Sequence, residues 1–215
     1  MRLASFASVV LLAICAAVAQ ADDKDSGFAP IFDGKTLTGW TGSVDGYTVE
    51  DGAIKCLAKK GGLLYTDKEY GDFHLKLKFK LTPGANNGIG IRTPKQGDPA
   101  YVGMELQVLD DTADQYKNLK EYQYHGSIYG VVAAKRGHQK AVGEWNTQEV
   151  IAKGNHIKII LNGETIVDAD IAKASDPKTA DGQNHPGLKR DKGYIAFCGH
   201  GHDVWFKDIE IKELK

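Results

Sequence analysis

Hydrophobic and polar residues alternate over short stretches of this chain. In "FHLKLKFKL", residues 73–81, every odd position is hydrophobic and every even position is His or Lys. This period of two predicts a β-strand with one buried face and one solvated face. In "HIKIILNGETIVDADI", residues 156–171, two similar runs flank Asn162-Gly163, which predicts a tight β-hairpin.

The same pattern recurs along the chain. Further strands are predicted at 47–49, 53–57, 88–92, 103–109, 149–152, 193–198 and 204–212. In the last of these the hydrophobic parity changes after Phe206, which predicts a bulge near Lys207 and Asp208. Helical periodicity is confined to a short turn at 114–121, and the polar segment 176–192 is predicted to be a surface loop. Short strands between Gly, Asn, Asp and Pro predict an all-β sandwich.

The first 21 residues have a different character. Arg2 is followed by a mostly apolar run, and Ala19-Gln20-Ala21 has the small-x-small pattern that signal peptidase recognises. We therefore predict a secretory signal peptide at 1–21 and one mature domain at 22–215, secreted or periplasmic after cleavage near Ala21. The apolar run is too short for a convincing membrane span, and no later stretch is apolar enough for one.

Composition narrows the class of protein. The chain has 215 residues, a formal net charge of −1 and no Lys/Arg run, which excludes a typical nucleic-acid binder. Two cysteines, Cys56 and Cys198, follow the signal segment. They form either one disulfide or two buried free thiols, and the thiols are favoured because each cysteine lies within a predicted strand.

The stretch "YVGMELQVLDD", residues 101–111, carries the main candidates for chemistry. Glu105 and Gln107 share one face of a predicted strand, and Asp110 follows at its end. On a concave sheet the first two side chains point into one groove, and Asp110 joins them if the strand bends. A partly desolvated carboxylate has a raised pKa that suits acid/base catalysis. The alternative is a solvated outer face.

Aromatic and polar residues outside this strand suit a sugar ligand. His125 and Tyr129 lie in "YQYHGSIYG", a segment that would either contact a sugar ring or cover the core. Glu144 and Trp145 lie in another loop, where Trp145 would either stack on a sugar or anchor the core. Arg92 ends a predicted strand and would either bind a polar group across the groove or form a surface ion pair.

Metal ligands are not assigned. His200 and His202 share one side of a strand, but no third ligand is placed beside them. Asp110, Asp111 and Asp114 lack the Gly and distal Glu of a helix-loop-helix calcium loop. The sequence requires no cofactor, although a divalent metal such as calcium remains compatible with these groups.

Several motifs taken together resemble the 3-keto-disaccharide hydrolase domain family. They include "FAPIFDGKTLTGW", "NNGIGIR", "YVGMELQVLDD", "GEWNTQEV" and "GHGHDVWFKDIEIKEL", and the match runs from Phe28 to Leu214. The resemblance implies a concanavalin A-like jelly-roll β-sandwich of two antiparallel sheets. It also implies a secreted glycoside hydrolase or lyase that acts on sugars oxidised to a ketone at C3. A base would remove the C2 proton, the glycosidic oxygen would leave C1, and water would then add.

The resemblance also suggests roles for the candidate residues. The acid/base candidates are Glu105, Asp110 and His125, and the substrate-binding candidates are Arg92, Gln107, Tyr129, Glu144, Trp145 and His200. A divalent metal would be an alternative means of polarising the ketone. The expected partner is a glycoside or oligosaccharide, with no nucleic acid and no membrane span in the mature chain.

A departure from related glucanases favours elimination over ordinary hydrolysis. Glucanases of this fold carry Glu-x-Asp-x-x-Glu on a groove strand, whereas this chain has Glu105-x-Gln107-x-x-Asp110. The central amide makes a retaining mechanism with two carboxylates less suitable. The alternatives to an enzyme are a non-catalytic carbohydrate-binding module and a structural or adhesion domain.

Overall fold

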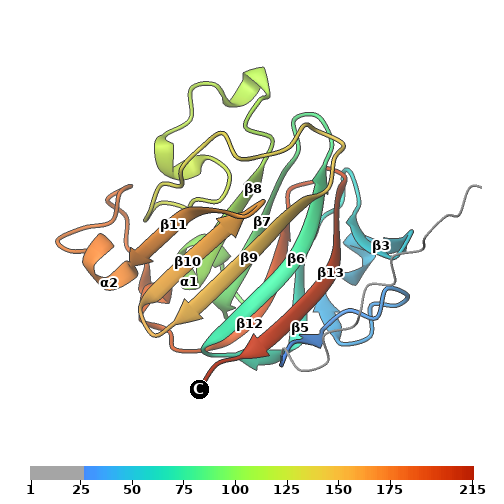
Figure 1. The fold of residues 1–215 in the computed structure, drawn as a ribbon, viewed down its shortest axis with the longest axis horizontal. Coiled ribbons are helices and arrows are strands. Elements are labelled where there is room, and N and C mark those ends of the chain that lie inside the picture. The colour runs from blue at the N-terminus through green and yellow to red at the C-terminus, as the bar shows by residue number, and fades with distance from the viewer. Residues whose placement is uncertain (1–26) are drawn as a thin grey trace, which may run out of the picture.

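Two antiparallel β-sheets pack face to face in the computed structural model, which describes residues 27–215 (Figure 1). The predicted signal peptide lies outside the described residues. Between the sheets, the Phe197 ring stacks on Trp40 and on Phe206, with ring centroids 5.1 Å and 3.9 Å apart. Trp40, rather than Trp145, is therefore the tryptophan that anchors the core.

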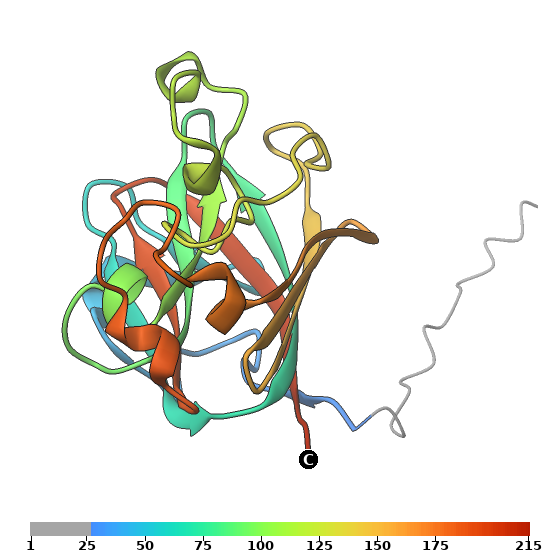
Figure 2. The ribbon, with the colours of Figure 1, turned by 90° about the vertical axis from the view of Figure 1, so that its left-hand side faces the viewer.

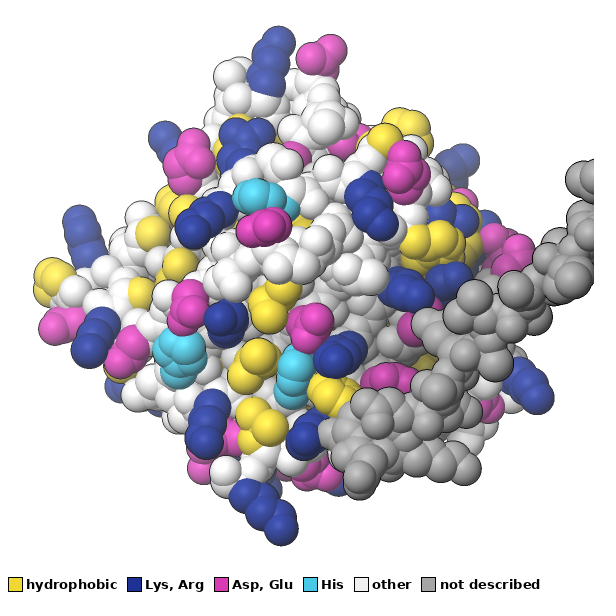
Figure 3. Space-filling view, in the orientation of Figure 1, with side chains coloured by type: hydrophobic (Ala, Val, Ile, Leu, Met, Phe, Trp, Pro, Cys, Tyr) yellow, Lys and Arg dark blue, Asp and Glu magenta, His cyan; other side chains and the backbone are white. Residues whose placement is uncertain are grey.

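The larger, eight-stranded sheet is called here the back sheet. Its main path is β11 (Glu164–Asp170), β10 (His156–Leu161), β9 (Asn146–Lys153), β6 (Phe73–Leu81), β13 (Val204–Glu213), β4 (Ala53–Cys56) and β3 (Tyr47–Glu50), and β1 (Ala29–Pro30) pairs with β13. Burial alternates along β6 as its sequence predicts. Lysines, acidic residues and histidines are interspersed over the outer face of this sheet (Figure 3).

Two local predictions are confirmed on the back sheet. β10 and β11 form the expected hairpin, and Asn162 and Gly163 both have positive φ, as a primed turn requires. On β13 the pairing with β6 shifts between Lys207 and Glu210, and Asp208 has a φ of 51°. The bulge therefore lies where the sequence predicts it.

The smaller, five-stranded sheet is called the front sheet. Its order is β2 (Trp40–Gly42), β5 (Gly62–Tyr70), β12 (Gly193–Gly199), β7 (Asn86–Thr93) and β8 (Met104–Leu109). Met104, Leu106 and Val108 of β8 point into the core. Glu105 and Gln107 therefore point away from the back sheet, onto the outer face of the front sheet.

The loops of the described chain contain short helices and 3-10 turns. The helices are α1 (Pro99–Val102) and α2 (Ile171–Ala174), and the 3-10 turns are η1 (Val44–Gly46), η2 (Asp114–Tyr116), η3 (Glu121–Gln123) and η4 (Pro186–Lys189). Helix α1 packs against β7, β8 and η4, whereas α2 packs against β11 of the back sheet. In Figure 2 the back sheet is seen nearly edge-on, with α1 and η4 on the side away from it. The predicted turn at 114–121 is thus two separate 3-10 turns.

The segment 176–192 is more than a surface loop. The His185 side chain is buried, contacts the Ala100 carbonyl oxygen through Nδ1 at 2.9 Å and contacts Asp181 through Nε2 at 3.0 Å. These contacts fasten the segment to α1. Within residues 27–215, no helix has the length and hydrophobicity needed to cross a bilayer.

Candidate functional site

Glu105 and Gln107 line a pocket of about 240 Å³ on the outer face of the front sheet. The pocket lining combines amides, carboxylates, a histidine and tyrosines. Its polar and aromatic members are Asn86, Asp98, Tyr101, Glu105, Gln107, Tyr116, Gln123, Tyr129 and His200. Strand β8, the α1 segment, the η2–η3 loop and the end of β12 all contribute, so the pocket brings together segments that lie far apart in sequence.

Glu105 reaches the centre of this pocket because β7 carries a glycine beneath it. Gly88 lies across from Gln107, and a Cβ added to Gly88 would lie only 1.9 Å from the Glu105 Oε1 atom. The Glu105 side chain therefore lies across β7 towards β12. Gly88 has no positive φ, so the glycine is needed for space and not for an unusual backbone conformation.

The Glu105 carboxylate is buried, and one of its oxygens lacks a hydrogen-bond partner. The residue is only 6% exposed, and Oε1 receives no hydrogen bond from residues 27–215. His200 Nε2 lies 3.6 Å from Oε1, which is an ion-pair distance but too long for a hydrogen bond. Burial raises the pKa of Glu105, and the nearby His200 opposes that shift. A buried, under-bonded carboxylate is suited to accept a proton from a ligand.

Two other ionisable side chains, His200 and Asp98, lie in the pocket with Glu105 and change its proton affinity. The nearby negative charge of Glu105 raises the pKa of His200, so the imidazolium form is favoured. Asp98 Oδ1 accepts from the Ala100 backbone N–H at 3.0 Å and caps α1, and its negative charge also raises the pKa values of Glu105 and His200. The pocket therefore pairs a proton acceptor with a proton donor.

An extra segment runs alongside β8 and places Tyr129 next to Glu105. The backbone N–H of Tyr129 donates to the Glu105 carbonyl oxygen at 2.9 Å, and the N–H of Gln107 donates to the Ser127 carbonyl oxygen at 3.0 Å. Leu106 and Ile128 form the β-bridge between these bonds. Tyr129 thereby joins Glu105 and Gln107 in the pocket, as its predicted role in binding requires.

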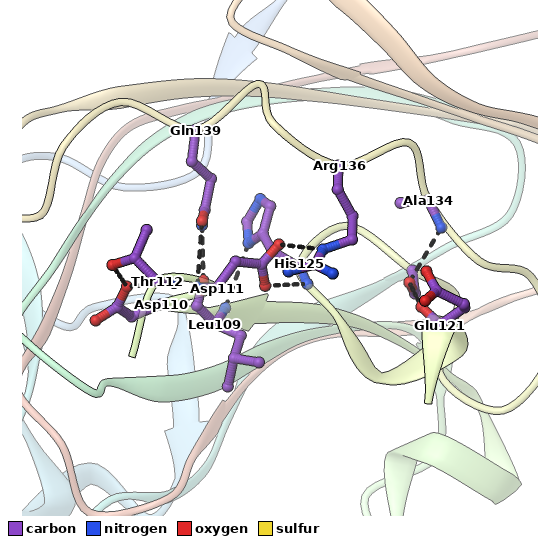
Figure 4. Close-up of polar contacts among 10 residues, drawn as sticks. Leu109, Asp110, Asp111, Thr112, Glu121, His125, Ala134, Arg136 and Gln139 are labelled. Atoms are coloured by element: carbon purple, nitrogen blue, oxygen red, sulfur yellow. Dashed lines mark hydrogen bonds and ion pairs between the residues drawn. The ribbon is translucent and has the colours of Figure 1, made fainter. Parts of the chain in front are cut away.

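Asp110 is not brought into the pocket, contrary to the predicted convergence with Glu105. It accepts from the Gly84 N–H at 2.8 Å. It also accepts from the N–H and the hydroxyl of Thr112, at 3.0 Å and 2.6 Å (Figure 4). These donors lie in the turns at the end of β8. Asp110 is thus a structural group, and the prediction that it serves as an acid/base residue is corrected.

His125 is also placed away from the pocket. Its Nδ1 accepts from the Leu109 N–H at 3.3 Å (Figure 4). Its ring lies 5.0 Å from that of Phe79 in the core. Burial lowers the pKa of His125 to about 3, and the nearby Gln148 of the back sheet opposes this shift only partly. The imidazole is therefore neutral and packed in the core outside the pocket, which corrects its predicted place in the site.

Two predicted binding residues, Arg92 and Trp145, lie outside the pocket as well. Arg92 is buried and donates to the carbonyl oxygens of Gly71 and Gly154 and to the Asp72 carboxylate, so it holds turns together. Trp145 lies beside the Lys80 and Lys207 ammonium groups, 5.1 Å and 4.3 Å from its ring centroid. Those lysines extend from β6 and β13.

Glu144 precedes Trp145 in the exposed loop before β9 and does not line the pocket either. For Arg92, Glu144 and Trp145, the predicted place in the groove is therefore corrected. Four of the predicted site residues, Glu105, Gln107, Tyr129 and His200, do line the pocket.

Some residues that line the pocket were not predicted from the sequence. Asp98 stands immediately before Pro99, and this pair is a recognisable start signal for a helix. Tyr101 follows on the same helix, and Asn86 and Gln123 reach the pocket from β7 and η3. The helix signal could have located Asp98, but no sequence spacing connects Gln123 with Glu105.

The remaining candidates concern metals and sulfur. Across residues 27–215, no three His, Cys, Asp or Glu side chains are grouped so as to hold a metal ion. Cys56 and Cys198 are buried free thiols, which confirms the favoured alternative. The pKa of the Cys198 thiol is raised well above the usual value, by burial and then by the nearby negative charge of Glu105.

Comparison with known proteins decides the family. Residues 27–212 match the model of the 3-keto-alpha-glucoside-1,2-lyase-like domain. The chain belongs to this family. A relative, the 3-keto-disaccharide hydrolase of Bacteroides thetaiotaomicron, is 29% identical over an alignment of 231 positions, gaps included, which covers 87% of this chain and 79% of the relative. The family resemblance of the motifs is thus confirmed.

Solved structures agree with the fold. A provisionally assigned glycosyl hydrolase from Parabacteroides distasonis ATCC 8503 has 31% identity and a TM-score of 0.77, covering 87% of this chain and 99% of that one. A carbohydrate-binding module from Bacillus subtilis is 12% identical with a TM-score of 0.54, covers 81% of this chain and 96% of its own, and shares the fold alone. The two-sheet antiparallel sandwich predicted from the sequence is confirmed.

Proposed function

We propose that this member of the 3-keto-alpha-glucoside-1,2-lyase-like family cleaves glycosides whose sugar carries a ketone at C3. The observation that carries the proposal is Glu105, a buried carboxylate with one oxygen free of hydrogen bonds in a pocket. The name of the Bacteroides relative supports the substrate class. The pocket volume of about 240 Å³ is below the roughly 300–1,000 Å³ of drug-sized ligand sites, which suits one enclosed sugar ring.

In the proposed reaction Glu105 is the base. A ketone at C3 acidifies the C2 proton, and Glu105 takes that proton. The electron pair of the C2–H bond then forms the enolate. The enolate then reforms the ketone, a C1–C2 double bond forms, and the glycosidic oxygen leaves C1 with the C1–O electron pair. Water adds to C1 afterwards, and C2 regains a proton, so the net reaction is hydrolysis.

His200 is the proposed donor to the leaving oxygen. Its raised pKa favours the imidazolium form, and its side chain is 49% exposed, so an aglycone could depart beside it. Gln107 and Asn86 offer amide groups for sugar hydroxyls. This arrangement does not need the second carboxylate of a retaining glycosidase, which Gln107 replaces.

The decisive experiment offers the mature protein a glucoside and its 3-keto derivative, with and without chelator, and measures release of the aglycone. We expect cleavage of the keto derivative only. Cleavage that stops on chelation would show that a divalent metal such as calcium is the cofactor. If neither compound is cleaved while an oligosaccharide still binds, the protein is a carbohydrate-binding module and the enzyme proposal is wrong.

We also propose that the protein is secreted or periplasmic, because residues 1–21 have the pattern of a signal peptide. The expected N-terminus of the exported protein is Asp22. Sequencing the N-terminus of protein isolated from the cell envelope and from the medium tests this, and an intact Met1 in all fractions would contradict it.

A further inference from the structure

We propose that Tyr129 donates the hydrogen bond to the C3 carbonyl oxygen of the substrate, and that Gln123 fixes the direction of that bond. The inference rests on the proposed function and concerns the same pocket. It assigns the stabilisation of the enolate to one hydroxyl and adds Gln123 as a positioning residue.

Position is the first step. Segment 126–129 pairs antiparallel with β8, and Ile128 lies opposite Leu106. The neighbouring residues Tyr129 and Glu105 therefore lie opposite each other. Side chains opposite each other in such a pair have Cβ atoms about 4.5–5.5 Å apart. The base that takes the C2 proton and the donor to the C3 oxygen must be neighbours, because C2 and C3 are bonded. Glu105 and Tyr129 meet this requirement.

The direction of the hydrogen bond is the second step. The Lys120 backbone N–H donates to Gln123 Oε1 at 2.9 Å, and a backbone N–H can only donate. The oxygen of the Gln123 amide is thereby fixed on the Lys120 side, so its nitrogen faces Tyr129. Gln123 Nε2 donates to the Tyr129 hydroxyl oxygen at 2.9 Å. Tyr129 is therefore an acceptor towards Gln123.

It follows that the Tyr129 proton is directed elsewhere. An amide NH₂ group accepts no hydrogen bond, so the phenolic O–H cannot be satisfied by Gln123. Within residues 27–215 no acceptor receives this proton in a hydrogen bond, and Tyr129 lines the pocket. Donation from Gln123 also polarises the hydroxyl and strengthens it as a donor. A carbonyl oxygen that gains negative charge is the matching acceptor.

The test separates proton removal from departure of the aglycone. Y129F and Q123L are compared with wild type for exchange of the C2 proton of a 3-keto glucoside in D₂O and for cleavage of substrates with good and poor leaving groups. We expect Y129F to lower both rates by about 100-fold or more, equally for both leaving groups, as loss of an oxyanion donor does. Q123L should lower kcat by about 10-fold with little change in KM, as loss of polarisation at one hydrogen bond would.

Y122F is the matched control, because Tyr122 packs edge-on against Tyr129 with ring centroids 6.4 Å apart but does not line the pocket. Its rates should equal those of wild type. Wild-type exchange in folded Y129F would overturn this inference alone, and so would a loss that grows with leaving-group basicity. A wild-type protein that neither exchanges nor cleaves the keto sugar would overturn the proposed function together with this inference.

Discussion

Strand β8 and the turn that follows it each carry a buried carboxylate, yet the two serve different purposes. Glu105 and Asp110 are 6% and 3% exposed, so burial does not distinguish them. Asp110 accepts three hydrogen bonds from Gly84 and Thr112, whereas the Oε1 atom of Glu105 accepts none. Hydrogen-bond saturation, rather than burial or charge, separates the structural acid from the candidate catalytic one.

The difference has a backbone origin. Asp110 stands where β8 ends, and the N–H groups of a turn are free to reach its side chain. Glu105 stands in mid-strand, where backbone N–H groups are engaged in pairing with β7 and with segment 126–129. A mid-strand acid on this face can be satisfied only by side chains or by a ligand.

The largest effect is expected from E105Q. Removing the base should lower the turnover of a 3-keto glucoside by about 1,000-fold. Because burial raises the pKa of Glu105, the ionised carboxylate destabilises the fold at neutral pH, and the free energy of unfolding should not fall. Denaturant unfolding and aglycone release measure both. E149Q, on the back sheet, should keep wild-type turnover, and wild-type turnover in E105Q would remove Glu105 from the mechanism.

The opposite outcome is expected from D110A. Removing an acceptor of three hydrogen bonds should lower the free energy of unfolding by about 2–3 kcal/mol, while the turnover of the folded fraction stays within a few-fold of wild type. D114A is the control, since Asp114 is exposed on η2. A stable D110A protein with turnover reduced as strongly as in E105Q would return Asp110 to the catalytic group.

G88A tests the space that lets Glu105 lie across β7. The added methyl group would lie 1.9 Å from the Glu105 carboxylate, so the base must move and turnover should fall by about 10–100-fold. G90A is the matched control, because the three atoms nearest to a Cβ at Gly90 belong to Ala196, Thr93 and Pro99, at 3.2–3.4 Å, whereas the atoms nearest to a Cβ at Gly88 are those of Glu105. In the E105Q background, G88A should cost little further activity. An equal loss of turnover in both backgrounds would show that Gly88 acts independently of Glu105.

The effect expected at the buried His125 is on stability alone and appears only as the pH falls. The pKa of about 3 in the folded state is below the ordinary 6.5, so the unfolded chain alone binds a proton between these values. The stability that neutral His125 contributes should therefore be present above pH 6.5 and fall as pH drops towards 3, by up to about 1.4 kcal/mol per pH unit. Unfolding free energies of H125Q should show a weaker pH slope than wild type. Stability curves for H125Q and wild type that run parallel over this pH range would contradict the assignment.

The sequence predicted most of the architecture because strand burial alternates. The lysine-rich face of β6 and the Asn162-Gly163 turn are local signals, and both are confirmed. β5 was missed because its burial does not alternate, and its pairing with β12 is irregular near Ala196. The short strands β1 and β2 carry too few residues to show a period.

The site was predictable only where strand periodicity controls it. Glu105 and Gln107 share a face because they are two residues apart. Asp110 and His125 were misplaced because turn hydrogen bonds decide their positions, and such bonds leave no period in the sequence. Gln123 was missed because it reaches Tyr129 through the fold of one 3-10 turn.

The space above Gly88, which the Glu105 carboxylate fills, means that substitutions at positions 88 and 105 constrain each other. A long acid at position 105 is compatible only with a glycine at position 88, since any larger residue would occupy the place of the carboxylate. Relatives that lose the acid are released from this restriction and are free to accept a side chain on β7. Joint variation of positions 88 and 105 would therefore distinguish members of the family that keep this base from members that have turned the same sheet to another use.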